Sequence, residues 1–206
     1  MMSKRFVWNF EIKNESLLEL PSNNDMPVDE LRWESRYFWP ESAIISLNGL
    51  DDQFLELSRY EAKHRQDTYY LLPDVNFNLK MRRDQLLYKP MLKQMTWATA
   101  YGKKIKLTAT EQSLSIPDHN PIDIQSLLVN AKDTIKTVTV SKEALIYQFP
   151  TTPKLKMELA RLCIGDAVYF SLSLESKVLT WVEYLSKNLL QGKTPCDYVT
   201  FLKTLI

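Results

Sequence analysis

Residues 67–90, DTYYLLPDVNFNLKMRRDQLLYKP, organise our interpretation of the chain, because they place basic residues where a strand usually carries core residues. Lys80 and Arg82 alternate with apolar neighbours, so they share one face of a predicted strand. A polar turn at 83–85 follows, and the antiparallel strand that returns from it ends in Lys89. Cations on neighbouring strands repel one another unless an anion lies between them. The stretch therefore predicts either an anion-binding surface or the solvated outer face of an antiparallel sheet.

Composition limits the partners that such a surface could have. The chain has 206 residues, of which 45% are hydrophobic, enough to build the core of one domain. Lys and Arg number 26 against 25 Asp and Glu, so the net charge is only +1. We therefore expect neither nucleic acid nor a membrane surface as a partner, and any anion site must come from local clustering. Composition does not decide the oligomeric state.

Two further features predict a cytoplasmic protein. No apolar run reaches the ~18 residues of a transmembrane helix. The two cysteines, Cys163 and Cys196, lie far apart in the sequence, which favours reduced thiols over a disulfide framework.

Hydrophobic periodicity predicts many strands and few helices. Predicted strands cover 6–13, 31–39, 78–82, 86–89, one or two segments within 96–111, and 134–140, 144–149, 154–164 and 167–175. Predicted helices cover 121–132 and 178–189, and a last helix opens at Pro195. The predicted fold class is α+β, with a mostly antiparallel, closed or nearly closed β-barrel that forms a tunnel and has helices packed outside.

Polar residues occupy alternating positions on several of these strands. The in-phase sets are Arg32, Glu34 and Arg36; Lys80 and Arg82; Lys89; Lys156 and Glu158; and Ser171, Ser173 and Glu175. A sandwich would place these sets on its outer surface, whereas a barrel with a wet interior would place them inside. Periodicity alone leaves both arrangements open.

The order of these segments resembles the CYTH group of triphosphate tunnel metalloenzymes, which includes thiamine-triphosphatases, inorganic triphosphatases and class IV adenylyl cyclases. The similarity covers residues 30–206, and residues 1–29 fall outside it as an added strand or arm. The matching segments are Arg32-Trp33-Glu34-Ser35-Arg36 for the opening Glu-x-Glu-x-Lys strand, Asp67-Thr68-Tyr69-Tyr70, Leu79-Lys80-Met81-Arg82-Arg83, Leu86-Leu87-Tyr88-Lys89, Lys142, Met157-Glu158-Leu159, Ser173-Leu174-Glu175 and the closing residues 195–202.

The resemblance implies a tunnel in which basic side chains hold a triphosphate and acidic side chains hold Mg²⁺ or Mn²⁺. Carried over by position, Lys80, Arg82 and Lys89 are the catalytic candidates. The candidates for binding the phosphates are Arg36, Lys80, Arg82, Lys89 and Lys142. Glu34, Glu158 and Glu175 are the candidates for the metal, since hard cations take oxygen ligands. The implied activity is metal-dependent hydrolysis of inorganic triphosphate, thiamine triphosphate or a nucleotide.

Two departures from the family pattern favour an alternative. Arg32 stands where the family has its first glutamate, and Ser173 stands where it has the first glutamate of the late pair. A guanidinium beside a divalent ion costs several kcal/mol even at an effective dielectric near 20. The alternatives are therefore a module that binds polyphosphate, nucleotide or an acidic protein segment without turnover, and a scaffold filled by internal salt bridges.

Overall fold

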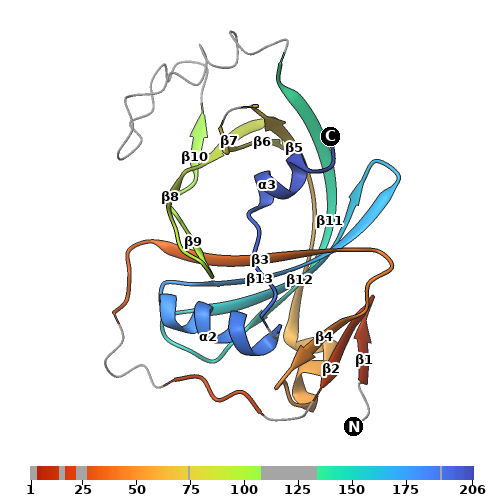
Figure 1. Ribbon diagram of the computed structural model, residues 1–206, viewed down its shortest axis with the longest axis vertical. Helices are drawn as coiled ribbons and strands as arrows, with labels where there is room; N and C mark the ends of the chain where they lie inside the picture. The colour runs from red at the N-terminus through yellow and green to blue at the C-terminus, as the bar shows by residue number, and fades with distance from the viewer. Residues whose placement is uncertain (1–3, 14–16, 22–26, 74, 108–133, 191) are drawn as a thin grey trace.

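Mostly antiparallel strands dominate the secondary structure of the computed structural model, as the sequence predicts (Figure 1). The structure describes residues 4–13, 17–21, 27–73, 75–107, 134–190 and 192–206. The larger sheet contains β3 (Arg32–Pro40), β5 (Tyr60–Leu71), β6 (Asn78–Arg82), β7 (Gln85–Lys89), β8 (Met91–Gln94), β9 (Thr99–Tyr101), β10 (Ile105–Leu107), β11 (Lys136–Gln148), β12 (Leu155–Ile164) and β13 (Ala167–Ser176). The predicted hairpin at 78–89 is confirmed, with Arg83 and Asp84 at its turn.

The strands of the larger sheet pair in the order β10-β7-β6-β5-β11-β12-β13-β3-β9-β8. Because this order begins at β10 and ends at β8, strand pairing does not confirm the predicted closed barrel. The two ends are nevertheless close along the chain, since only Pro90 separates β8 from β7, the neighbour of β10, and residues 102–104 separate β9 from β10. Proline has no N–H to donate, which interrupts a ladder at that point.

A smaller sheet and two short 3-10 helices complete the first part of the chain. β1 (Lys4–Val7) pairs antiparallel with β2 (Phe10–Lys13), and β2 pairs in parallel with β4 (Ile45–Asn48). The prediction of one continuous strand over 6–13 was wrong, because the chain reverses at Trp8, whose φ is 49°. The 3-10 helices are η1 (Asp52–Leu55) and η2 (Leu57–Arg59).

The C-terminal part agrees with the predicted strands except at one turn. Residues 134–140 and 144–149 belong largely to the single strand β11, because Lys142 stays in the ladder opposite Arg65 of β5. The predicted turn at Gly165 is confirmed, with a φ of 57° that suits glycine. The helices are α2 (Leu179–Leu189) and α3 (Tyr198–Lys203). The predicted helix at 121–132 lies outside the described residues.

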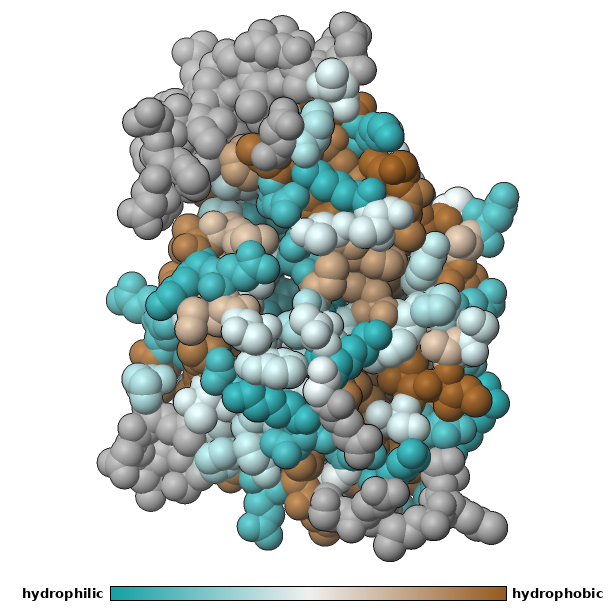
Figure 2. All heavy atoms as spheres, viewed as in Figure 1, coloured by the Kyte–Doolittle hydropathy of each residue, from teal (hydrophilic) through white to brown (hydrophobic). Residues whose placement is uncertain are grey.

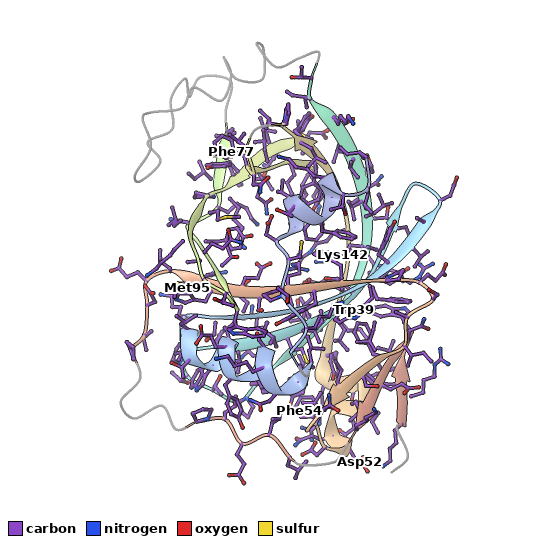
Figure 3. The ribbon with its side chains drawn as sticks, in the orientation of Figure 1. Trp39, Asp52, Phe54, Phe77, Met95 and Lys142 are labelled. Carbon is purple, nitrogen blue, oxygen red and sulfur yellow. The ribbon has the colours of Figure 1, made fainter. Side chains whose placement is uncertain are left out.

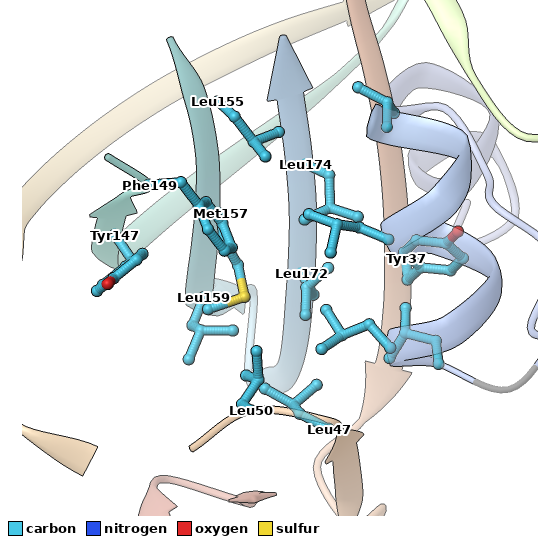
Figure 4. Packing of buried hydrophobic residues seen from close by; sticks show 14 of the residues in the cluster. Tyr37, Leu47, Leu50, Tyr147, Phe149, Leu155, Met157, Leu159, Leu172 and Leu174 are labelled. Carbon is cyan, nitrogen blue, oxygen red and sulfur yellow. The ribbon is translucent and has the colours of Figure 1, made fainter. Parts of the chain in front are cut away.

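The two faces of the larger sheet differ sharply in character. Trp33, Tyr37, Leu172 and other apolar residues of β3, β12 and β13 form one core with α2 and the smaller sheet (Figure 4). The opposite face of the same strands carries the alternating charged sets. Since the apolar face is covered, the charged face is turned toward the region that the strands surround (Figure 1).

The inner face is itself divided into a charged half and an apolar half. Along β5, Arg65 and Asp67 are followed in phase by Tyr69 and Leu71. Tyr69 and Leu71 pack with α3 in a second core cluster, so α3 covers the apolar half. No described helix combines the length and the apolar composition that a membrane span requires.

We expect Leu172→Ala to lower the free energy of unfolding by about 2–5 kcal/mol, because it leaves a cavity in the main core. Leu172 has no exposed surface. The matched control is Leu57→Ala, since Leu57 is 54% exposed and should contribute little. Urea denaturation of both variants measures the difference, and equal losses would contradict the described core.

Candidate anion-binding site

A cavity of about 740 Å³ opens inside the larger sheet. Its wall includes residues from β3, β5, β6, β7, β11, β12 and β13, together with the turn after β9 and Tyr198 of α3. Hydrophilic side chains gather near the middle of the face shown in Figure 2. This volume lies within the range of small-molecule sites in proteins.

The lining of the cavity is strongly cationic. It includes twelve Lys and Arg residues and five acidic residues, an excess of seven positive charges in a chain whose net charge is +1. The cations are Arg32, Arg36, Lys63, Arg65, Lys80, Arg82, Lys89, Lys103, Lys104, Lys142, Lys156 and Lys177, and the acids are Glu30, Glu34, Asp67, Glu158 and Glu175. The rest of the chain is therefore net negative, and the positive charge is concentrated at one place.

All eight residues predicted for the site line this cavity. They are Glu34, Arg36, Lys80, Arg82, Lys89, Lys142, Glu158 and Glu175. Lys142 extends from the inner side of β11 (Figure 3). The charged sets thus face inward, as a wet interior requires. The catalytic, phosphate-binding and metal-binding roles of these residues remain predictions.

Arg36 is the centre of a buried network of ion pairs. Its Nε donates to Glu34 Oε1 at 2.9 Å, and its Nη1 lies 3.4 Å from Glu158 Oε1. Lys89 Nζ donates to the other oxygen of Glu34 at 2.8 Å, and Lys142 Nζ donates to Glu158 at 2.5 Å. The Arg36 side chain is only 10% exposed.

Asp67 organises a second group of cations on β5 and β6. Arg82 Nε and Nη2 both donate to the Asp67 carboxylate at 2.5 Å, in a two-point contact. Lys80 Nζ donates to Asp67 Oδ2 at 2.9 Å and to the Tyr69 hydroxyl at 3.1 Å. The sequence had suggested Asp67 only as the start of a strand motif.

Burial and charge set the protonation of these groups. Burial would raise the pKa of Asp67 and Glu158, but their cationic neighbours lower each to about 2. The same competition, with Lys89 and Arg36 prevailing, holds the pKa of Glu34 well below its usual range. Burial lowers the pKa of Lys80 and Lys142 to about 8, even though each has a carboxylate partner. At neutral pH the network is therefore ionised throughout.

The three predicted metal ligands do not fit a divalent cation. Arg36 stands between Glu34 and Glu158, while Glu175 accepts from Arg32 Nη1 at 3.2 Å. Among the described residues, no group of three or more His, Cys, Asp or Glu side chains is arranged to hold a metal ion. A metal would have to displace cations that already satisfy these carboxylates.

Several lining residues were not predicted from the sequence. β5 contributes the half-buried Arg65, which is in phase with Lys63, Asp67 and Tyr69. That alternation over Tyr60–Leu71 was visible in the sequence and could have identified it. Asn78 also lines the cavity, and its buried Oδ1 has no donor among the described residues, so it can accept from a ligand or water.

Comparison with known proteins does not assign a family. No family model and no curated protein sequence matches the chain. Among solved structures, the fold is similar to the crystal structure of a candidate adenylate cyclase from Bacillus halodurans, with a TM-score of 0.37 and 10% sequence identity. That match covers 84% of this chain and 87% of the other. Similarity at this level is too low to transfer a fold family or an activity.

We expect Arg36→Gln to lower the free energy of unfolding by about 3–5 kcal/mol, because it leaves two buried carboxylates with one cation each. The matched control is Arg32→Gln. The Arg32 side chain is 63% exposed and pairs with Glu175, so its loss should cost at most about 1 kcal/mol. Chemical denaturation at pH 7 distinguishes the two, and an equal cost would contradict the central role of Arg36.

Proposed function

We propose that the cavity binds an anion that carries several phosphate groups, and that it does so without a metal ion. The excess of seven positive charges in the lining is the observation that carries this function. Lys and Arg donors form charge-assisted hydrogen bonds with phosphate oxygens. A single phosphate group brings about two negative charges, so several are needed to balance the lining.

The salt-bridged scaffold is the main alternative, and the size of the cavity disfavours it. Internal ion pairs satisfy the carboxylates of Glu34, Asp67 and Glu158, yet the cavity retains about 740 Å³, and five of its twelve cations form no ion pair with a described residue. Unbalanced like charges raise the free energy of the folded chain when they lie close together. An anionic ligand relieves that repulsion.

Metal-dependent hydrolysis, which the CYTH resemblance implies, is not included in the proposed function. Glu34, Glu158 and Glu175 each accept from a Lys or Arg side chain. The arrangement instead suits a binding module, with cations that hold phosphate groups and carboxylates that hold the cations in place. An acidic protein segment would meet the same charge, and the experiment below separates it from phosphate.

We also propose that the larger sheet closes into a tunnel around the cavity. β7 and β8 would act as one strand bent at Pro90, which joins the two ends of the sheet. The Gly102 N–H donates to the Pro90 carbonyl at 3.0 Å, so the pairing of this strand with residues 99–107 continues past the proline. The charged half of the inner face would then line the open end of the tunnel, and α3 would lie at the opposite end.

We expect sodium tripolyphosphate to raise the melting temperature in the presence of EDTA. A ligand at about 100 times its dissociation constant adds about 2.7 kcal/mol of stability. Sulfate at equal ionic strength is the control for screening, and a poly-glutamate peptide tests the acidic-segment alternative. A shift with the peptide but not with tripolyphosphate would contradict phosphate binding, as would a shift that appears only when Mn²⁺ replaces EDTA.

We expect the affinity for tripolyphosphate to fall by about tenfold or more as pH rises from 7 to 9.5. Lys80 and Lys142, with pKa values of about 8, lose their charges in this range. Their neighbours Arg36 and Arg82, whose pKa values lie above the usual range, stay charged. Titration calorimetry at both pH values measures the change.

The double variant Lys80→Arg/Lys142→Arg is the control for this pH dependence. It keeps both charges at pH 9.5, so any change in the ligand's own ionisation affects it and the wild type equally. The same pH dependence in both proteins would show that these two lysines do not contribute to binding.

A further inference from the structure

We propose that Arg65, with Lys104 and Lys156, forms the main phosphate-binding subsite of the cavity, on the solvent side of the buried ion pairs. This inference rests on the proposed function and deepens it, because it identifies the cations that contact the ligand first. The sequence analysis did not single out Arg65 and Lys104, and it gave Lys156 only as one of the in-phase polar residues. The three come from different parts of the wall: β5, the turn after β9 and β12.

The buried cations are already occupied by protein carboxylates. Arg36 and Lys89 pair with Glu34, while Lys80 and Arg82 pair with Asp67. A phosphate group could bind them only by sharing or displacing these partners. Breaking a buried ion pair leaves an uncompensated charge and costs several kcal/mol. The buried set is therefore better suited to shaping the site than to making its first contacts.

Among the lining cations nearer to solvent, Arg32 and Lys63 pair with Glu175 and Glu61, but the others have no such partner. Arg65, Lys103, Lys104, Lys156 and Lys177 form no ion pair with any described residue. Arg65 and Lys156 are half-buried, whereas the other three are exposed. A half-buried cation gives a stronger contact than an exposed one, because solvent screens it less. Arg65 and Lys156 thus combine free donors with partial desolvation.

Arg65 also occupies a central position in the charge distribution. It lies directly opposite Lys142 in the pairing of β5 with β11. Burial lowers the pKa of Lys142 and of Lys104, and the positive charge of Arg65 lowers both further. The charge of Arg65 therefore acts on groups from two sides of the cavity, and a phosphate group there would relieve both repulsions. The planar guanidinium can bind two phosphate oxygens at once.

The test compares variants of the two sets by titration calorimetry with tripolyphosphate at pH 7. We expect Arg65→Gln to weaken binding by about tenfold or more, because the ligand loses a hydrogen bond to a charged group. Lys156→Met should weaken it to a smaller extent. Lys80→Met should weaken it several-fold less than Arg65→Gln, and should lower the melting temperature because Asp67 loses one of its two partners.

The matched control is Arg161→Gln, which removes the same charge outside the cavity. Arg161 lies 3.7 Å from Glu143 and is not part of the lining. The affinity of this variant should stay within about twofold of the wild type, since the Arg161 charge lies outside the cavity lining and is paired with Glu143. If Arg65→Gln does not fold, Arg65→Lys replaces it; this variant keeps the charge but loses the planar fork, and should still weaken binding.

The subsite would be overturned if the wild type binds tripolyphosphate, Arg65→Gln binds it as tightly as Arg161→Gln does, and Lys80→Met shows the larger loss of affinity. That outcome would leave the proposed function intact. A wild type that does not bind tripolyphosphate at millimolar concentration would overturn both. Weaker binding in Arg65→Gln at an unchanged melting temperature supports the subsite directly.

Discussion

The charged interior depends on one arrangement, in which the Arg36 guanidinium stands between the carboxylates of Glu34 and Glu158. Burying so many ionised groups is unfavourable unless each has a partner, because desolvation costs several kcal/mol per charge. Arg36 supplies a partner to two carboxylates at once, while Lys89 and Lys142 complete the set. The same arrangement decides the chemistry. With a guanidinium between them, Glu34 and Glu158 accept from cations of the protein.

The fold allows this interior because each strand separates apolar from charged residues between its two faces. Leu172 and Trp33 lie in a core that α2 and the smaller sheet cover, while the residues that alternate with them line the cavity. Within the inner face, charge then gives way to apolar residues toward α3, as from Arg65 to Leu71 along β5. A ligand would therefore meet cations first and a closed apolar end last. This change from charged to apolar residues along the inner face suits an anion that enters the cavity from solvent and stays there, rather than one that passes through the cavity.

Much of this could be predicted from alternation along the chain, and the rest depends on contacts between strands. Lys80, Arg82 and Lys89 were found because they share a face, and the hairpin that carries them is as predicted. Whether that face pointed inward could not be decided, since a sandwich and a barrel give the same period. The pairing of Arg36 with Glu158 joins residues that are 122 positions apart, so no local pattern reveals it. Arg65 was missed for a different reason, because no strand was predicted over 60–66, the first part of β5. Its alternation with Lys63 and Asp67 was present in the sequence.

A crystal structure with tripolyphosphate and Mn²⁺, recorded at the manganese absorption edge, tests the central claim most directly. The account predicts phosphate groups in contact with Arg65, Arg36 still between Glu34 and Glu158, and no anomalous signal at these carboxylates. An anomalous peak that bridges Glu34 and Glu158, with Arg36 displaced from between them, would contradict it and restore the metal-dependent chemistry that the CYTH resemblance implies.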